Sequence, residues 1–207
     1  MQIIVYDIEI KKAILGRNEE PIEGIEYCQG WSDHTGMGIS SITAYDYAKN
    51  RMRVFMDDNM GEFALMVQEA DLIVGFNSIA FDNKVCRANG IAIPEGRDYD
   101  ILVELWAAAG LPRHFAGKQS GGFGLDATCD ANFGLKKTGN GALAPVLYQR
   151  GQYGALLDYN INDVYLTARL LDKIIAQKGV LNDPRDPGEF LELRVPSLDA
   201  VTEKDAA

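Results

Sequence analysis

Apolar and polar positions along the chain follow two patterns in succession, first that of strands and then that of strands alternating with helices. Residues 3–8 form an apolar, β-branched run that is typical of a buried central strand. Residues 39–47 and 51–56 are the next strand-like runs, and with the first they predict an antiparallel meander. Shorter strands are predicted at residues 72–76 and 99–102, between segments of helical spacing.

The helical segments dominate the later part of the chain. Helices are predicted where apolar residues recur every three or four positions, at residues 62–70, 81–89, 104–109, 125–133 and 153–177. The apolar stripe of the last and longest segment is expected to face the core. This order of elements indicates an α/β fold, with a mixed β-sheet flanked by helices.

The connecting segments are polar and rich in glycine. We expect residues 11–38 to form a hairpin and loop with one strand near residues 25–31, and residues 118–124 and 135–141 to be loops. Towards the end of the chain, residues 190–195 are predicted to add an edge strand, and the last ten residues are expected to be disordered.

Composition narrows the class of protein. Of the 207 residues, 47% are hydrophobic and 24% charged, which is the ordinary balance of a soluble globular protein. Since no apolar run approaches the roughly 20 residues that span a bilayer, we expect no membrane protein. Cys28, Cys86 and Cys129 are odd in number and widely spaced, so neither a disulfide framework nor a zinc cluster is expected. Because the first strand begins at residue 2, leaving no room for a signal peptide, we expect a reduced, cytoplasmic protein.

The formal net charge of −10 bears on possible partners. Proteins that grip nucleic acid over a broad surface normally carry a basic stripe. An acidic chain can still act on nucleic acid, but the expected footprint is small, a few nucleotides at most.

Two carboxylates stand at the end of the first strand. Asp7 and Glu9 are two positions apart, so alternation along a strand sends both side chains to the same face. Like charges so close repel each other and raise one pKa unless a cation lies between them. We therefore interpret the pair as a candidate site for a divalent metal.

Three further residues can join this pair. Asp82 follows the strand predicted at residues 72–76, whereas Tyr159 and Asp163 lie four residues apart, and hence side by side, on the last helix. Oxygen ligands favour hard cations, so Mg²⁺ or Mn²⁺ is expected rather than zinc. Two such ions, roughly 3.5–4 Å apart, clamp the attacking and leaving oxygens of a phosphodiester. Tyr159 is suited to orienting the attacking water.

The order and spacing of these residues resemble the motifs of the DEDD superfamily of 3′-to-5′ exonucleases, in its tyrosine subgroup. The motifs Asp-x-Glu, Asn-x-x-x-(Phe/Tyr)-Asp and Tyr-x-x-x-Asp match at Asp7/Glu9, Asn77/Phe81/Asp82 and Tyr159/Asp163. The sister subgroup has histidine five residues before the last aspartate, where this chain has Asp158. Residues 125–127 and 133–134 also resemble the segment before the third motif in proofreading domains of family B DNA polymerases.

The resemblance implies an RNase H-like fold over residues 1–178, with residues 179–207 as a C-terminal extension. It implies two Mg²⁺ or Mn²⁺ ions, with Asp7 bridging both, Glu9 and Asp163 completing the shell of the first, and Asp82 holding the second. The candidate substrate-binding residues near the terminal nucleotide are Ile8, Ile10, Asn77 and Phe81. Many relatives carry threonine at the position of Ile10, so an altered contact with that nucleotide is expected.

The predicted function is a metal-dependent 3′-5′ exonuclease that hydrolyses single-stranded DNA ends to nucleoside 5′-monophosphates, with replication or repair proteins as possible partners. Three alternatives stay open: an exoribonuclease resembling RNase D, an endonuclease of the RNase H or junction-resolving kind, and a non-catalytic binding module of the same fold. His34 and His114 are interpreted as surface or loop residues. The residues interpreted either as phosphate contacts or as solvated surface are Lys118, Lys136, Lys137 and Arg150.

Overall fold

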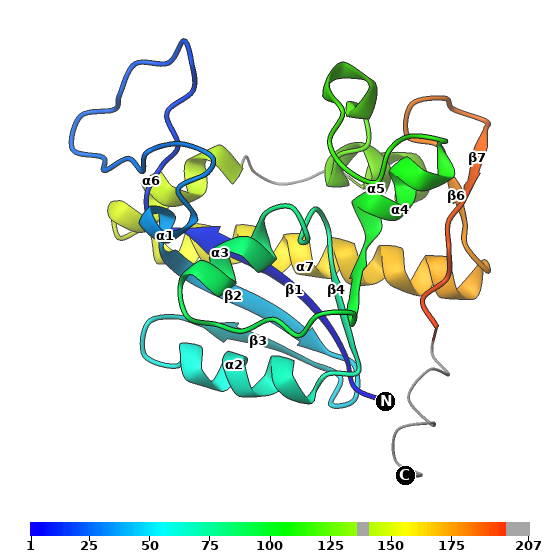
Figure 1. Ribbon diagram of the computed structural model, residues 1–207, viewed down its shortest axis with the longest axis horizontal. Helices are drawn as coiled ribbons and strands as arrows, with labels where there is room; N and C mark the ends of the chain where they lie inside the picture. Colours follow the sequence, from blue (N-terminus) through cyan, green and yellow to red (C-terminus); the bar gives the residue numbers. More distant parts are fainter. Residues whose placement is uncertain (136–140, 198–207) are drawn as a thin grey trace.

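A five-stranded mixed sheet forms the centre of the protein in the computed structural model, which describes residues 1–135 and 141–197 (Figure 1). In the order β3-β2-β1-β4-β5, the strands are β1 (Ile3–Ile10), β2 (Ile39–Asp46), β3 (Arg51–Phe55), β4 (Leu72–Gly75) and β5 (Asp98–Asp100). β1 pairs antiparallel with β2, which pairs antiparallel with β3, whereas β4 pairs parallel with both β1 and β5. The antiparallel meander and the mixed sheet are therefore confirmed.

Helices cover both faces of this sheet, and alternation along β1 explains the two layers. Ile4, Tyr6 and Ile8 are buried on one face with α2 (Met60–Glu69) and α3 (Asp82–Ala88). Ile3 and Val5 are buried on the opposite face, in the core that includes the long helix α7 (Tyr153–Ala176). This α/β arrangement is compatible with an RNase H-like fold.

The remaining helices lie around one end and one side of the sheet (Figure 1). They are the short helices α1 (His34–Met37), α4 (Ile101–Ala108), α5 (Leu125–Phe133) and α6 (Ala144–Gln149), with the 3₁₀ turns η1 (Gly117–Ser120) and η2 (Gly141–Leu143). α4 and α5 join the core around α7, whereas α1 lies against α3. Within the described ranges, no helix combines the length and the apolar character that crossing a bilayer requires.

Several predicted elements need correction. In place of a strand at residues 25–31, the structure has an isolated bridge between Ala13 and Tyr27 followed by α1. α4 begins earlier than predicted because Asp100 caps it, accepting hydrogen bonds from the backbone N–H groups of Leu102 (3.0 Å) and Val103 (3.4 Å). α6 was not predicted, since six residues are too few to show a helical period. The prediction of a loop at residues 136–140 and of disorder over the last ten residues lies outside the described residues.

The C-terminal segment does not extend the central sheet. Instead of forming an edge strand there, β7 (Phe190–Glu192) pairs antiparallel with β6 (Val180–Asn182) in a separate two-stranded sheet. Leu181, Leu191 and Leu193 from this hairpin are buried in the same core as α7. The apolar side chains are therefore buried, as expected for a strand. They pack against helices, however, and the local sequence pattern does not reveal this packing partner.

Candidate active site

Carboxylates from three separate elements line one cavity at the carboxyl end of β1. The cavity has a volume of about 410 Å³. The predicted site residues among its lining are Asp7, Ile8, Glu9, Ile10, Asn77, Phe81, Asp82, Tyr159 and Asp163. The structure thus brings together residues that lie up to 156 positions apart in the sequence, from Asp7 to Asp163 (163 − 7 = 156).

β1 supplies the first two carboxylates. Asp7 and Glu9 continue the face of Ile3 and Val5, as alternation along a strand requires. The register shifts just beyond them, because Glu9 pairs with Ser41 whereas Ile10 pairs with Ile39. One residue of β2 is therefore extra at this point, which is the arrangement of a β-bulge that bends the strand end and re-aims side chains beside a site.

Ile8 and Ile10 lie on the opposite face of β1 from the carboxylates. Their side chains are buried in the core under α2 and α3, although both residues line the cavity. Burial in the core limits how much of either side chain a substrate can touch, so any contact with the terminal nucleotide is made at the edge of the cavity.

A tight turn after β4 carries the second motif. Gly75 ends β4, and a Cβ at this position would lie 2.5 Å from the Cβ of Ser78, so only glycine fits. Asn77 then adopts a left-handed backbone conformation, with φ of 67°. The buried carboxylate of Asp100 holds this turn by accepting hydrogen bonds from the N–H groups of Asn77 (2.9 Å) and Ile79 (3.0 Å). Asp100 was not identified from the sequence as part of the site, because the turn residues that it holds, Asn77 and Ile79, lie more than 20 positions before it.

Asp82 stands at the first position of α3 and reaches the central strand. Its Oδ1 accepts a hydrogen bond from the backbone N–H of Ile8 at 3.1 Å. Burial raises the pKa of Asp82 despite this hydrogen bond, and the charges of Asp100 and Asp163 raise it further. The next residue, Asn83, fixes the helix start, because it accepts a hydrogen bond from the Tyr6 hydroxyl. A carboxylate so buried needs a positive partner to stay charged at neutral pH.

α7 supplies Tyr159 and Asp163, and between them a residue that the motifs do not include. Asn160 is fully buried and donates a hydrogen bond from Nδ2 to Oδ2 of Asp7 at 2.7 Å. The Ser41 hydroxyl donates to its Oδ1 at 3.4 Å. Asn160 therefore ties α7 to β1 and fixes the orientation of Asp7. A buried asparagine inside a long amphipathic helix is a weak signal that could have identified it.

The hydroxyl of Tyr159 points into a confined part of the cavity. A Cβ added to Gly141, at the start of η2, would lie 3.0 Å from this hydroxyl oxygen, so the glycine backbone closes over it. Burial raises the pKa of Tyr159, and the charges of Asp163 and Glu9 raise it further. The phenol is therefore protonated at neutral pH and can donate a hydrogen bond, but it cannot serve as a base.

Aromatic side chains form the outer part of the cavity. Phe81 and Phe76 line it together with Trp31, whose ring lies 6.2 Å from that of Phe81 at an interplanar angle of 65°. Trp31 was not identified from the sequence, because it lies in a polar segment without a period. His34 lines the adjoining groove.

Four basic residues were considered from the sequence as possible phosphate contacts, and the structure describes two of them. Lys118 and Arg150 are exposed and line neither the cavity nor the adjoining groove. Lys136 and Lys137 lie outside the described residues. Their contact with substrate phosphates stays a prediction.

The donor set of the cavity fits a hard divalent cation. Asp7, Glu9, Asp82 and Asp163 offer only carboxylate oxygens, which are the ligands that Mg²⁺ and Mn²⁺ prefer. Among the described residues, however, no three histidine, cysteine, aspartate or glutamate side chains are arranged as a ready-made metal site. Asp7 and Asp82 instead accept hydrogen bonds from Asn160 and Ile8. A cation would share these carboxylates with the hydrogen bonds from Asn160 and Ile8, since each carboxylate has about four acceptor positions.

Comparisons with known proteins bear on the fold. No family model and no curated protein matches the sequence. Among solved structures, the chain is similar to the family B DNA polymerase from the hyperthermophilic archaeon Pyrobaculum calidifontis, with a TM-score of 0.58 and 20% identity over 84% of this chain. The match covers 24% of the polymerase, so this chain spans about a quarter of its length. The likeness identifies a fold shared with part of a DNA polymerase.

Proposed function

We propose that this chain is a two-metal 3′-5′ exonuclease that hydrolyses single-stranded DNA ends and releases nucleoside 5′-monophosphates. One observation carries the proposal: the residues of three separate sequence motifs line a single cavity. Two come from β1, three from the segment between β4 and the start of α3, and two from α7. A single motif match at a strand end or on a helix is common by chance. A chance arrangement of all three motifs around one cavity is far rarer.

The likeness to a solved structure supports this proposal independently of the cavity. The motifs resemble those of proofreading domains in family B DNA polymerases, and the backbone resembles part of one such polymerase. The motifs depend on a few side chains, whereas the structural likeness depends on the path of the backbone. Both lead to the same class of protein, so we propose an RNase H-like fold for residues 1–178.

Asp7, Glu9, Asp82 and Asp163 would hold two Mg²⁺ or Mn²⁺ ions. When bound, the ions would supply Lewis-acid stabilisation of the attacking and leaving oxygens of a phosphodiester. The cavity itself prepares the carboxylates for this role, because burial raises the pKa of Asp82 and makes a positive partner favourable. Asn160 keeps Asp7 oriented by its hydrogen bond from α7.

The other residues position the water and the substrate. The protonated hydroxyl of Tyr159 orients the attacking water by a hydrogen bond, a role that its raised pKa suits. Asn77 and Phe81 lie at the cavity edge, where they can contact the terminal nucleotide through the amide and the ring. Trp31 extends this aromatic wall beyond Phe81.

A time course on 5′-labelled single-stranded DNA tests the proposal. With Mg²⁺ or Mn²⁺, we expect a ladder that shortens one nucleotide at a time from the 3′ end, and no cleavage in EDTA. A closed circular single strand should stay intact, since it has no end. Faster cleavage of a matched RNA would reassign the substrate to RNA, cutting of the circle would favour an endonuclease, and no cleavage of any substrate would favour a non-catalytic module.

A further inference from the structure

A groove continues from the carboxylate cavity along the protein surface. Its volume is about 1030 Å³, and it shares with the cavity the residues Asp7, Trp31, Phe76, Asn77, Phe81 and Asp163. Small-molecule sites have volumes of about 300–1,000 Å³. The groove therefore has room for several linked units of a polymer that ends at the carboxylates.

Five aromatic side chains line this groove, and one of them, Trp106, is buried. Phe76 and Phe81 are partly buried, whereas Trp31 and Phe115 are 71% and 70% exposed. A single exposed aromatic residue is ordinary on a protein surface. Five in one groove, two of them exposed over most of their surface, instead provide flat apolar faces on which bases can stack.

Trp31 is held in place although it is exposed. The turn that carries it is closed by the carboxylate of Asp33, which accepts hydrogen bonds from the N–H groups of Gln29 (2.8 Å) and Gly36 (2.9 Å). The side chain of Asn89, at the end of α3, donates to the carbonyl of His34 at 2.9 Å. The backbone that carries Trp31 is therefore an ordered turn, which does not have to form when a base stacks on the ring.

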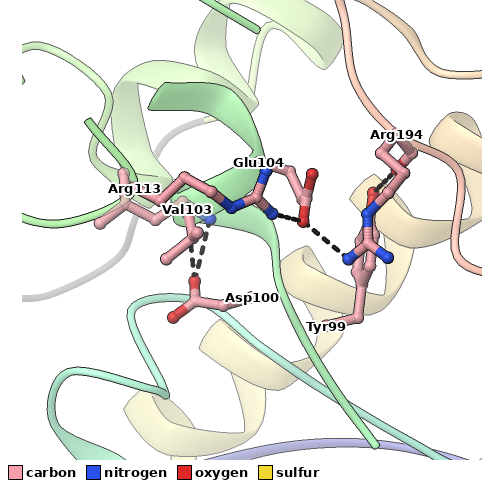
Figure 2. A network of polar contacts seen from close by, with 7 residues as sticks. Tyr99, Asp100, Val103, Glu104, Arg113 and Arg194 are labelled. Carbon is pink, nitrogen blue, oxygen red and sulfur yellow. Dashed lines mark hydrogen bonds and ion pairs between the residues drawn. The ribbon is translucent and has the colours of Figure 1, made fainter. Parts of the chain in front are cut away.

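Phe115 lies in a loop that is fixed on both sides. Before it, Arg113 forms an ion pair with the buried carboxylate of Glu104, which also binds Arg194 from the C-terminal segment at 2.8 Å (Figure 2). After it, the Ser120 hydroxyl accepts a hydrogen bond from the N–H of Ala116 at 2.8 Å. Trp31 and Phe115 come from separate loops that line the same groove.

Charge in the groove agrees with a phosphate-bearing polymer. Lys84 is exposed on α3 and lines the groove, as does His34. Asp7 and Asp163 lie where the groove meets the cavity. A cation along the groove can contact the phosphates of a DNA backbone. The carboxylates lie at one end of the groove, where bound metal ions would be needed to stabilise the 3′ end of the strand.

We propose that this groove binds the nucleotides upstream of the terminal one in single-stranded DNA, with bases stacked on Trp31 and Phe115 and a phosphate contacted by Lys84. The proposal rests on the proposed exonuclease function and adds to it the residues that hold the strand. Stacking on an aromatic side chain contributes about 1–3 kcal/mol per base. Loss of either ring should therefore weaken binding about 5-fold to 150-fold.

Fluorescence measurements on the full chain in EDTA, where no cleavage is expected, test the groove. Trp31 and Trp106 are the two tryptophans of the sequence, and both line the groove. Trp106 is only 3% exposed, so a base stacked in the groove should quench mainly the emission of Trp31. Oligothymidylate should quench the Trp31 emission, and the Trp31→Phe variant should bind with similar affinity but lose most of the quenching. Anisotropy of a labelled oligothymidylate should report weaker binding for Trp31→Ala and Phe115→Ala.

The matched control is Phe190→Ala, since Phe190 on β7 is 65% exposed and lies outside the groove. This variant should bind as the wild-type protein does. If Trp31→Ala and Phe115→Ala also bind as wild type, or if the oligonucleotide leaves Trp31 emission unchanged, the proposal is wrong and the aromatic groove serves another occupant, such as a protein.

A parallel cleavage assay in Mg²⁺ separates this proposal from the exonuclease function. Cleavage by the wild-type protein with normal binding by both alanine variants would overturn the groove and leave the function standing. Quenching and aromatic-dependent binding without any cleavage would support the groove and overturn the function.

Discussion

Asp100 offers a test of how the fold supports the site, because one buried carboxylate holds two structures at once. It caps α4 by accepting from the N–H groups of Leu102 and Val103, and it closes the turn of the second motif by accepting from Asn77 and Ile79. The turn leads directly to Asp82, so loss of the hydrogen bonds of Asp100 should also displace the carboxylate of Asp82 in the cavity.

The magnitude for Asp100→Ala follows from these contacts. Loss of the helix cap costs about 1 kcal/mol, and the two turn N–H groups lose a net of about 1 kcal/mol each. Burial raises the pKa of Asp100, so removing the charge returns part of this energy. We expect a net destabilisation of about 2–3 kcal/mol, which lowers the melting temperature of a domain this size by about 4–12 °C.

Thermal unfolding followed by circular dichroism measures this change, with Asp58→Ala, an exposed aspartate before α2, as the control. Asp100→Asn can keep Oδ1, which accepts three of the four hydrogen bonds, and should lose less than half as much. Exonuclease activity of Asp100→Ala, assayed well below its melting temperature, should also fall. An unchanged melting temperature would refute the reasoning about stability, and full activity in a destabilised variant would refute the link to the cavity.

Three further changes have expected outcomes. Tyr159→Phe should lower kcat about 10²-fold or more without abolishing metal binding, because only the water-orienting hydroxyl is lost; single-turnover cleavage and Mn²⁺ titration measure the two effects. Glu104→Gln removes a charge that binds Arg113 and Arg194 (Figure 2). We expect a destabilisation of only about 1–2 kcal/mol, because both arginines are about half exposed and can be solvated. Urea denaturation measures this change, and an unchanged midpoint would contradict it. The pKa of Asp100 is higher in the folded protein than in the unfolded chain, so its contribution to stability is most favourable below the unfolded value near pH 4 and falls as the pH rises through the folded pKa; Asp100→Asn should flatten that part of the pH profile, and an identical profile would contradict the assignment.

The central sheet and the motif residues could be predicted because their signals are local. The run at β1 is apolar and β-branched, and the spacing of Asp7 and Glu9 sets their common face whatever the tertiary structure. The separation of Tyr159 and Asp163 by one helical turn is likewise a property of the helix alone. Such residues can be identified without knowing what packs against them.

The supporting residues could not be predicted because their roles arise from contacts distant in sequence. Asn160 acts on Asp7, 153 positions away, and Asp100 acts on Asn77, 23 positions away. The hairpin of β6 and β7 shows the same limit, since its apolar positions are visible in the sequence but their burial against helices is not. Trp31 gave no periodic signal, and its importance depends on the groove beside it.

The central claim is that the carboxylates of this cavity catalyse metal-dependent release of nucleotides from a 3′ end. The most direct measurement is chromatography of the products from single-stranded DNA labelled at its 3′-terminal nucleotide, for wild type, Asp7→Asn and the exposed control Asp58→Asn. We expect labelled nucleoside 5′-monophosphate from wild type and Asp58→Asn in Mg²⁺ or Mn²⁺, none in EDTA, and none from folded Asp7→Asn. Equal release by Asp7→Asn, or no release by the wild-type protein with either metal, would contradict it.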